Sequence, residues 1–472
     1  MPMFIARIAF TVILSVMSIA AASHALLNKR DPRAAFGWIA VCLLFPLAGP
    51  VLYVLFGVNR VNTRARALDD RRPSVQATAV EHAVDHDHVA AEYSELARIS
   101  DAVSRRPLVG GNRIEVLRDG EEAYPPMLDS IRAAERTVVL ASYIFDTDET
   151  GRTFVEALAD AHDRGVDVRV LLDGLGQWYS WPHAARLLRH RGVPVARFLP
   201  PRLVPPAFHV NLRNHRKILV ADGTTAFTGG MNIGDRHRTS LETNRDPVSD
   251  VHFRLRGPVV RQIEEVFHED WAFATGHAAP DPDPPPPPEG PSICRTVVDG
   301  PNDDINKLAT ILVAAFSAAT ERIDIMTPYF LPPREMVSAL QSAALRGVDV
   351  GIVLPARNNL PFVHWATRNM LWELLKYGAK VYYQPPPFSH TKAISVDRHY
   401  VQFGSANLDP RSLRLNFEIA VEVYDREFGA PVTAHFDEVR ARSRAITLEE
   451  LDGRPLPERA RDAICWLFSP YL

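Results

Sequence analysis

The strongest constraint on the fold of this chain is a motif that the sequence contains twice. NHRKILVAD, at Asn214–Asp222, has a counterpart in SHTKAISVD, at Ser389–Asp397. Both copies read H-x-K-x4-D and continue, after six further residues, to two small residues, any residue and an Asn. Lysine is scarce in the chain, yet each copy contains one, so a chance match is a poor explanation. The sequence therefore predicts a duplicated unit.

The positions shared by the two copies supply the candidate site residues. They are an imidazole, an ammonium, a carboxylate and an amide: His215, Lys217, Asp222 and Asn232 in the first copy, and His390, Lys392, Asp397 and Asn407 in the second. The small pairs, Gly229-Gly230 and Gly404-Ser405, allow the backbone to approach a ligand closely. Residues two apart on a strand point to the same face, so we expect each His and its Lys to point together.

The sequence around the motifs is duplicated as well. Strand-like and helix-like segments alternate in both halves, and the pentapeptide RGVDV occurs at 164–168 and again at 346–350. Such alternation predicts mostly parallel α/β sheets with helices on their faces. We expect two tandem α/β domains, at 111–278 and 292–472, which form one pseudo-twofold unit. The proline-rich stretch at 279–291 is expected to be a stiff linker between them.

The N-terminus contains two long apolar runs. Residues 8–27 and 34–58 carry no formal charge, and each is long enough to cross a hydrocarbon core of ~30 Å as a helix. We therefore expect a two-helix transmembrane hairpin at 1–60, followed by a juxtamembrane linker at 61–110. A cleaved signal peptide is the alternative for the first run, but the length of the second argues against it.

The charges that flank these runs favour one orientation. The turn between them carries Lys29, Arg30 and Arg33, whereas Arg7 and the segment after the second run carry more arginines, at positions 60, 64, 66, 71 and 72. Because basic residues concentrate on the cytoplasmic side, we expect a multi-pass protein of the cell membrane with its catalytic domains in the cytoplasm.

The two motif copies complete each other chemically. One copy offers an imidazole, a cation and an amide, which is half of what a phosphodiester transfer needs. Two facing copies surround one phosphate with donors, and one imidazole can attack phosphorus while the other protonates the departing alcohol. Each His also needs a carboxylate to set its tautomer, and Asp250 and Glu418 lie at comparable positions after the motifs. There is no nucleophilic Cys and no dense carboxylate cluster in the motif, so we expect no metal and no other cofactor.

The two complete motifs resemble the signature of the phospholipase D superfamily. The stretch GSANLDPRSLRLNFE at Gly404–Glu418, the N-terminal run ending in GPVLYVLFGVNR, the segments SYIFDTDETG and TPYFLPP, and the final LFSPYL are similar to its bacterial cardiolipin synthase branch. The resemblance covers nearly the whole chain. One departure is ARNN at Ala356–Asn359, where the family commonly has an Asp.

The resemblance implies the transfer of a phosphatidyl group from one phosphatidylglycerol to the glycerol hydroxyl of another, through a phosphatidyl-histidine and without a metal. It implies a catalytic set, two phosphate-binding amides and two carboxylates that orient the histidines: His215, Lys217, Asp222, His390, Lys392 and Asp397; Asn232 and Asn407; Asp250 and Glu418. The family more often uses the first His as nucleophile, which favours His215. The implied partners are a phospholipid substrate and the membrane.

Three alternatives remain open at this stage. A membrane-bound phospholipase D that uses water, or a phosphatidyltransferase with another acceptor, would carry the same motifs. A nuclease is disfavoured by the apolar runs and by a net charge of −3 with no basic, aromatic groove in the sequence. A non-catalytic membrane scaffold would be expected to have lost part of one motif, and both are intact.

Overall fold

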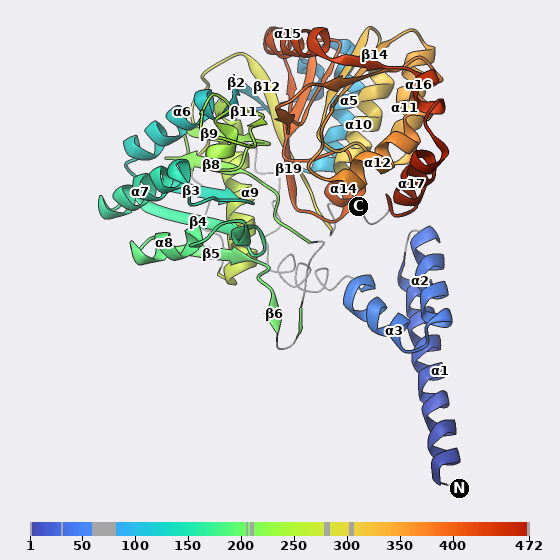
Figure 1. Cartoon of the computed structure of the whole chain (residues 1–472). Helices are drawn as coiled ribbons and strands as arrows, with labels where there is room; N and C mark the ends of the chain where they lie inside the picture. Colours follow the sequence, from blue (N-terminus) through green and yellow to red (C-terminus); the bar gives the residue numbers. More distant parts are fainter. Residues whose placement is uncertain are drawn as a thin grey trace. The chain divides into compact units, whose positions relative to one another are not determined.

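The computed structural model describes residues 2–29, 32–58, 82–203, 206–207, 212–277, 284–301 and 306–469 (Figure 1). The chain divides into two compact units, Met1–Arg72 with Pro201–Phe208, and Pro73–Pro200 with His209–Leu472. We call them the helical unit and the sheet unit. The basic segment at 59–81 and the first part of the proline-rich linker, 279–283, lie outside the described residues.

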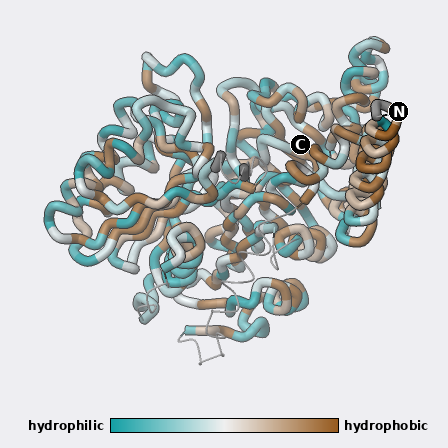
Figure 2. Tube along the Cα trace, turned by 90° about the horizontal axis from the view of Figure 1, so that it is seen from below, coloured by the Kyte–Doolittle hydropathy of each residue, from teal (hydrophilic) through white to brown (hydrophobic). Residues whose placement is uncertain are grey.

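The helical unit begins with one long apolar helix, α1 (Pro2–Asn28). Its stretch Phe4–Asn28 is long and apolar enough to cross a membrane, and little of it is buried inside the protein. Figure 2 shows this helix, next to the N-terminus, as predominantly hydrophobic along its length. The first predicted span therefore corresponds to a single helix.

The second predicted span, 34–58, is not a single helix. It forms α2 (Pro32–Leu44), a short helix α3 (Ala48–Leu52) and a π-helical turn at Tyr53–Gly57. A bend between Leu44 and Ala48 contains Pro46, whose ring cannot donate a helix hydrogen bond. After the bend the chain folds back so closely that a Cβ on Gly49 would lie 2.3 Å from the carbonyl oxygen of Val41. At 13 residues, α2 is too short to span a ~30 Å core.

The sheet unit contains one continuous sheet of sixteen strands. The strands of its first half are β2 (Leu108–Arg118), β3 (Thr137–Ser142), β4 (Asp167–Asp173), β5 (Val195–Phe198), β8 (Ile218–Ala221), β9 (Thr225–Gly229) and β11 (Val251–Arg256). Those of its second half are β12 (Ser292–Asp299), β13 (Arg322–Met326), β14 (Asp349–Pro355), β15 (Lys380–Gln384), β17 (Ala393–Val396), β18 (Tyr400–Gly404) and β19 (Glu418–Tyr424). β1 (Ala83–Val84) pairs with β2, and β20 (Arg444–Ile446) pairs with β15.

The strand order makes the duplication visible. It runs β15-β14-β13-β17-β18-β19-β12 and then β2-β11-β9-β8-β3-β4-β5, so that the second series repeats the first in reverse. The seam is the antiparallel pair of β2 with β12, in which Ser292 faces Asn112. An antiparallel pair of equivalent strands has a local twofold axis between them. The two halves therefore share one sheet, and each half has its own hydrophobic core on it.

Helices cover this sheet and connect its strands (Figure 1). In the first half they are α6 (Asp119–Ala133), α7 (Glu149–Asp163), α8 (Ala184–His190) and α9 (Val259–Thr275). α5 (Ser94–Ser104) precedes β2 in the chain but packs in the second half, against α10 and β12. In the second half they are α10 (Lys307–Ala318), α11 (Arg334–Leu345), α12 (Pro361–Met370), α13 (Trp372–Leu375), α14 (Pro410–Arg414), α15 (Arg426–Arg442), α16 (Leu448–Asp452) and α17 (Leu456–Leu467).

The repeated pentapeptide marks equivalent turns between a helix and a strand. Gly165 follows α7 and Gly347 follows α11, and both have φ +92°. A residue with a Cβ is strained in this left-handed conformation, which explains why Gly occupies both positions. The chain then enters β4 and β14, whose central residues are buried as the apolar pattern predicts.

Candidate active site

The two motif histidines lie together, just before equivalent strands. His215 precedes β8 and His390 precedes β17, and their ring centroids are 6.5 Å apart. Short contacts between the halves hold them there. Val248–Ser249 pairs in parallel with Phe388–Ser389, and the N–H of His390 donates to the carbonyl of Ser249 (2.8 Å). Correspondingly, Asn214 forms a bridge with Phe417, and the N–H of His215 donates to the carbonyl of Phe417 (3.0 Å).

The carboxylates beside the histidines are crossed between the halves. Nδ1 of His215 lies 3.2 Å from Oε2 of Glu418, which belongs to the second half. Nδ1 of His390 lies 2.9 Å from Oδ2 of Asp250, which belongs to the first half. In each pair the carboxylate accepts the Nδ1–H, which leaves Nε2 as the reactive nitrogen. Both imidazoles retain about a tenth of their exposure, so they are largely buried but still reach the surface.

Each motif lysine folds back on its own histidine. Nζ of Lys217 donates to the carbonyl of His215, and Nζ of Lys392 donates to the carbonyl of His390, both over 2.5 Å. Burial lowers the pKa of Lys217 to about 7 and that of Lys392 to about 8, although Glu418 and Asp250 raise both. Near neutral pH these lysines can gain or lose a proton, and a bound phosphate anion would favour their protonated forms.

The histidines are held mainly in their neutral form in the free protein. Burial lowers the pKa of His215, an effect that the Glu418 carboxylate opposes. Burial also lowers the pKa of His390, strongly, and the charges of Lys392 and Lys217 lower it further. Glu418 itself is ionised. Burial would raise its pKa, but its interactions with His215 and Lys217 and the hydrogen bond from Ser405 lower it.

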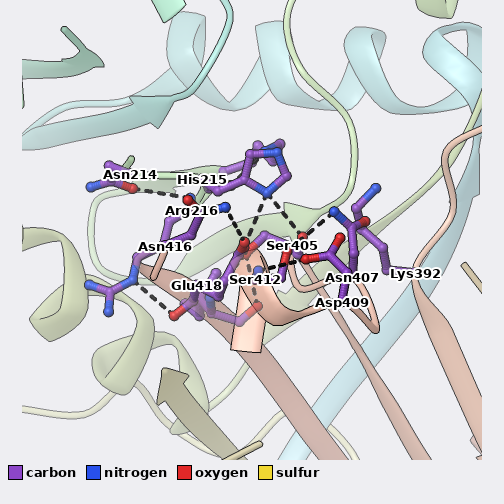
Figure 3. Close-up of polar contacts among 12 residues, drawn as sticks. Asn214, His215, Arg216, Lys392, Ser405, Asn407, Asp409, Ser412, Asn416 and Glu418 are labelled. Atoms are coloured by element: carbon purple, nitrogen blue, oxygen red, sulfur yellow. Dashed lines mark hydrogen bonds and ion pairs between the residues drawn. The ribbon is translucent and has the colours of Figure 1, made fainter. Parts of the chain in front are cut away.

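A hydrogen-bond network surrounds Glu418 (Figure 3). The hydroxyl of Ser405 donates to Oε2 of Glu418 (2.5 Å), and Nδ2 of Asn416 donates to Oε1 (3.2 Å). Nε of Arg216 donates to the Glu418 carbonyl (3.0 Å), and its NH1 donates to Asp270 on α9 (2.6 Å). The equivalent of Ser405 in the first motif is Gly230. A Cβ there would lie 2.6 Å from Oδ1 of Asp250, so only Gly leaves that carboxylate its place.

The two motif asparagines lie beside the histidines in different hydrogen-bonding states. Oδ1 of Asn232 accepts the N–H of Ile144 (3.1 Å), which fixes the orientation of its amide. Nδ2 of Asn407 donates to the Ser412 hydroxyl (3.3 Å), and its buried Oδ1 has no hydrogen-bond partner among the described residues.

The two motif aspartates differ from the expectation that they belong to the catalytic set. The Asp222 carboxylate accepts backbone N–H groups at the start of β3, including those of Arg136 (2.8 Å) and Thr137 (3.0 Å). The Asp397 carboxylate does the same at the start of β13, accepting from Glu321 (2.8 Å) and Arg322 (2.6 Å). A four-residue strand, β8 or β17, separates each histidine from its aspartate, and at ~3.3 Å per residue it carries the aspartate ~13 Å away, to the far end of the strand. Their observed contacts are those of residues that tie neighbouring strands together.

Several residues of the site were not predicted from the sequence. Ser405, Asn416, Arg216 and Asp270 are described above, and Tyr143 packs edge-on to His215 with ring centroids 5.1 Å apart. Arg216 offered the best signal, because a charged residue within a buried motif needs a buried partner.

The comparisons with known proteins agree with this arrangement. Residues 127–271 and 312–440 match the family described as "Cardiolipin synthase, PLD-like domain", and residues 16–57 match "Phospholipase_D-nuclease N-terminal". The chain belongs to the cardiolipin synthase family of the phospholipase D superfamily. The predicted family and the predicted pair of tandem α/β domains are thereby confirmed.

Similar proteins extend over nearly the whole chain. "Major cardiolipin synthase ClsA" of Bacillus subtilis (strain 168) is 32% identical over 458 residues, covering 94% of this chain and 95% of that protein. "Cardiolipin synthase A" of Pseudomonas aeruginosa (strain UCBPP-PA14) is 33% identical over 466 residues, covering 97% and 95%. The crystal structure of phosphatidylserine synthase from Haemophilus influenzae has a TM-score of 0.60 and 16% identity, over 80% of this chain and 100% of that one. At that identity it supports the fold alone.

Proposed function

We propose that this protein is a cardiolipin synthase that transfers a phosphatidyl group from one phosphatidylglycerol to another, giving cardiolipin and glycerol. The observation that carries the proposal is the single centre built from both motifs, in which each half supplies the carboxylate for the other half's histidine. The similar proteins named as cardiolipin synthases agree with it.

In the first step, the donor phosphate enters between His215 and His390. Nε2 of His215 attacks phosphorus, and the bond from phosphorus to the oxygen of the leaving glycerol breaks. His390 gives its Nε2 proton to that oxygen, so that glycerol leaves as a neutral alcohol. Both histidines have lowered pKa values in the free protein, and the negative charge of the bound phosphate raises them, which allows His390 to hold the proton.

In the second step, a second phosphatidylglycerol takes the place of glycerol. His390, now neutral, removes the proton from its headgroup hydroxyl, whose oxygen attacks phosphorus. The bond between phosphorus and His215 breaks, which releases cardiolipin and restores both histidines. Lys217, Lys392, Asn232 and Asn407 donate to the phosphate oxygens as negative charge grows on them. We assign Asp250 and Glu418 as positioning residues for the histidines, and Asp222 and Asp397 as positioning residues for the motif strands.

The test is to supply the purified full chain with phosphatidylglycerol and identify the products by mass spectrometry. Cardiolipin and glycerol, both lost in His215→Ala and His390→Ala, are the expected result. Phosphatidic acid as the main product would replace the proposal by a hydrolase. A mixed phosphodiester formed only with another added alcohol would replace it by a different phosphatidyltransferase. Samples denatured at neutral to mildly alkaline pH, at which a bond between phosphorus and histidine survives, assign the nucleophile. His390→Ala should still form the covalent phosphatidyl-histidine, but slowly, because the leaving glycerol lacks its proton donor, and His215→Ala should not form it.

The protein is associated with the membrane through its N-terminal apolar helix, and we propose that its catalytic domains face the cytoplasm. The contacts of the helical unit support a different path from the predicted two-span hairpin. The hydroxyl of Ser18 donates to the carbonyl of Pro46 (3.2 Å), so the bend lies beside the middle of α1. The Tyr53 hydroxyl then lies 2.8 Å from Nδ1 of His24, nearer the turn between α1 and α2.

The second apolar segment therefore enters as far as the bend and returns to the side from which it came. Tyr53 also packs edge-on to Trp38 near the start of α2, with ring centroids 5.4 Å apart. In this path only α1 crosses the membrane. The side of the turn then carries Lys29, Arg30, Arg33 and the arginines of 59–72, whereas the other side carries only Arg7 of the basic residues in this segment. That asymmetry is stronger than in the two-span path and favours a cytoplasmic turn.

Thiol labelling in right-side-out membrane vesicles tests this orientation. The three native cysteines are buried, so an added exposed cysteine can be labelled selectively. A membrane-impermeant maleimide should label Pro2→Cys from outside and Leu345→Cys only after permeabilisation. Labelling of both from the same side would support the two-span hairpin and reject the returning path.

A further inference from the structure

The sheet unit exposes large apolar side chains next to its site. Trp178 and Trp181 lie in the loop after β4, and 74% of Trp181 is exposed. This loop is well packed despite its exposure. Nδ1 of His183 bonds the carbonyls of Gln177 (2.9 Å) and Ser180 (3.0 Å), and its ring is flanked edge-on by Trp178 and Trp181, at 4.9 Å each. The indoles are therefore held outward by a structured loop.

The same loop leads directly to the catalytic centre. Tyr179 packs edge-on to Tyr143 with ring centroids 6.3 Å apart, and Tyr143 packs on His215. The Asp173 carboxylate, at the end of β4, accepts the N–H of Asn214 (3.0 Å), the residue before His215. The exposed indoles thus stand at the rim of the site.

The second half exposes apolar residues at the equivalent place. β14 is the counterpart of β4, and the loop after it leads to Leu360 and Phe362 at the start of α12, both exposed. This loop is tied to the segment after β13, because the Tyr329 hydroxyl lies 2.8 Å from Oδ1 of Asn359. Asn359 belongs to the ARNN stretch in which the chain departs from its family.

The last helix extends this second patch. α12 and α17 pack antiparallel, since Arg368 bonds Glu458 (3.0 Å) and Arg461 lies over the ring of Trp365 (4.3 Å). The end of α17 therefore lies alongside the start of α12. Leu467 and Phe468 at that end are exposed, with 67% of Leu467 accessible.

We propose that these six residues form an apolar rim that docks on the surface of the lipid bilayer, with the site facing the headgroups. The rim consists of Trp178, Trp181, Leu360, Phe362, Leu467 and Phe468. This inference rests on the proposed function, because it concerns how a phospholipid still in a bilayer reaches the buried histidines. The rim explains how a headgroup phosphate is reached without extracting the whole lipid from the membrane.

The bilayer fits this surface better than another protein does. The rim comes in two patches that belong to different halves and follow the equivalent strands β4 and β14, whereas a protein interface is centred on one closed apolar core. Tryptophan is enriched where a protein meets the membrane interface. Exposed Arg357, in the loop before Leu360, adds a cation for lipid phosphates. The apolar helix α1 already attaches the chain to a membrane.

Site-directed labels on the full chain test the docking. Single cysteines at Trp181, Phe362 and Leu467 carry a small fluorophore, and the protein is reconstituted in vesicles of phosphatidylglycerol and phosphatidylcholine with brominated chains. Two matched controls lie at the other end of the antiparallel pair of α12 and α17. They are Leu456→Cys at the start of α17 and Trp372→Cys at the start of α13, just after α12 ends, and both residues are exposed. The ends of α17 are ~18 Å apart, whereas interfacial side chains reach only ~5–10 Å into the boundary, so a short-range quencher separates them.

We expect the lipid-borne bromine to quench the three rim labels about fivefold more than the controls. Equal quenching at rim and control positions would overturn the proposal. Rim labels that remain open to aqueous iodide would also overturn it, and labels shielded from both quenchers would show that protein covers the rim instead. The quenching measurement needs no turnover, so a failure of the docking proposal can be told apart from a failure of the proposed reaction. As an activity readout, Trp181→Ala with Phe362→Ala should lower the ratio of the rate on bilayers to that on short-chain micelles about tenfold.

Discussion

Replacement of Glu418 by Gln tests the crossed arrangement most directly. Glu418 is buried, ionised and hydrogen-bonded to Nδ1 of His215, and it belongs to the other half of the chain. Gln preserves the shape of the side chain but removes the negative charge that stabilises an imidazolium. Its amide can also present an N–H to Nδ1 of His215, where the carboxylate oxygen accepted a hydrogen bond. Hydrogen bonds to charged groups contribute about 1.5–3 kcal/mol. Because each 1.36 kcal/mol is tenfold in rate, we expect kcat to fall by about 10- to 150-fold.

The dependence of the rate on pH identifies which histidine is affected. Glu418 raises the pKa of His215, so its removal lowers that pKa. If His215 must be neutral to attack, the acidic limb of the rate profile should move to lower pH in Glu418→Gln. Asp250→Asn removes the carboxylate next to His390, whose proton is needed for the leaving group. Its alkaline limb should therefore move to lower pH, while the acidic limb stays in place.

The assay is the initial rate of product formation from phosphatidylglycerol over pH 5–9, measured for the parent chain and both variants. KM should change little, because neither carboxylate contacts the phosphate in the proposed mechanism. The reasoning would be refuted if Glu418→Gln left the acidic limb in place, or if Asp250→Asn moved that limb. Either result would mean that the carboxylates do not serve the histidines that they contact in the structure. The alkaline limb does not separate the two variants, because both carboxylates raise the pKa of Lys217 and Lys392. Circular dichroism of both variants controls for loss of folding.

Three further predictions follow from the same geometry. Asp222→Asn should lower the free energy of unfolding by about 1–3 kcal/mol, since backbone N–H groups lose an ionised acceptor. Burial would raise the pKa of Asp222, but these N–H donors lower it. The stabilisation by Asp222 is therefore present above pH ~4 and is lost below it. Thermal melts of the parent chain and the variant at pH 7 and pH 3 would show the difference. Lys217→Met should reduce turnover by about 10²–10³. It should nevertheless raise the melting temperature at pH 7, a gain that disappears above pH ~10, because the buried lysine binds its proton less tightly when folded. Gly230→Ala should lower kcat about as much as Asp250→Asn, because the added Cβ displaces the Asp250 carboxylate. Gly110→Ala, whose Cβ would meet only a side chain at 3.4 Å, should be nearly neutral. Equal losses of kcat in the two glycine variants would contradict this.

The sequence was sufficient for features that depend on local spacing. The H-x-K interval predicts that His215 and Lys217 lie close together, and they do so just before β8 rather than on it. The repeated RGVDV predicts equivalent turns, which the left-handed Gly165 and Gly347 occupy. The duplication itself predicts that both histidines share one centre. These inferences need only the periodicity of strands and the steric freedom of Gly.

The sequence was not sufficient where distant segments meet. The spacing after His215 and His390 does not say that Asp250 serves His390 and Glu418 serves His215. That exchange accompanies contacts between the halves, in which the residue before Asp250 pairs beside His390 and the residue before Glu418 pairs beside His215. The position of Asp222 could have been foreseen from the length of β8, but the motif pattern alone groups it with the site. Hydropathy likewise indicates that residues 34–58 are apolar, but it does not locate the bend at Pro46 within that segment.

The crossed carboxylates also bear on how the duplication persists. Each half contains one histidine that depends on a carboxylate of the other half, and one carboxylate that orients the other half's histidine. Neither copy can therefore lose these residues while the other keeps the activity. Losing Asp250 would disable the second copy's histidine and not the first's. The chain therefore resembles a dimer whose two subunits have been joined and share a single active site. Selection on either copy is selection on both, and divergence is left to residues such as Arg216 and Thr391, which occupy the same motif position but differ in charge.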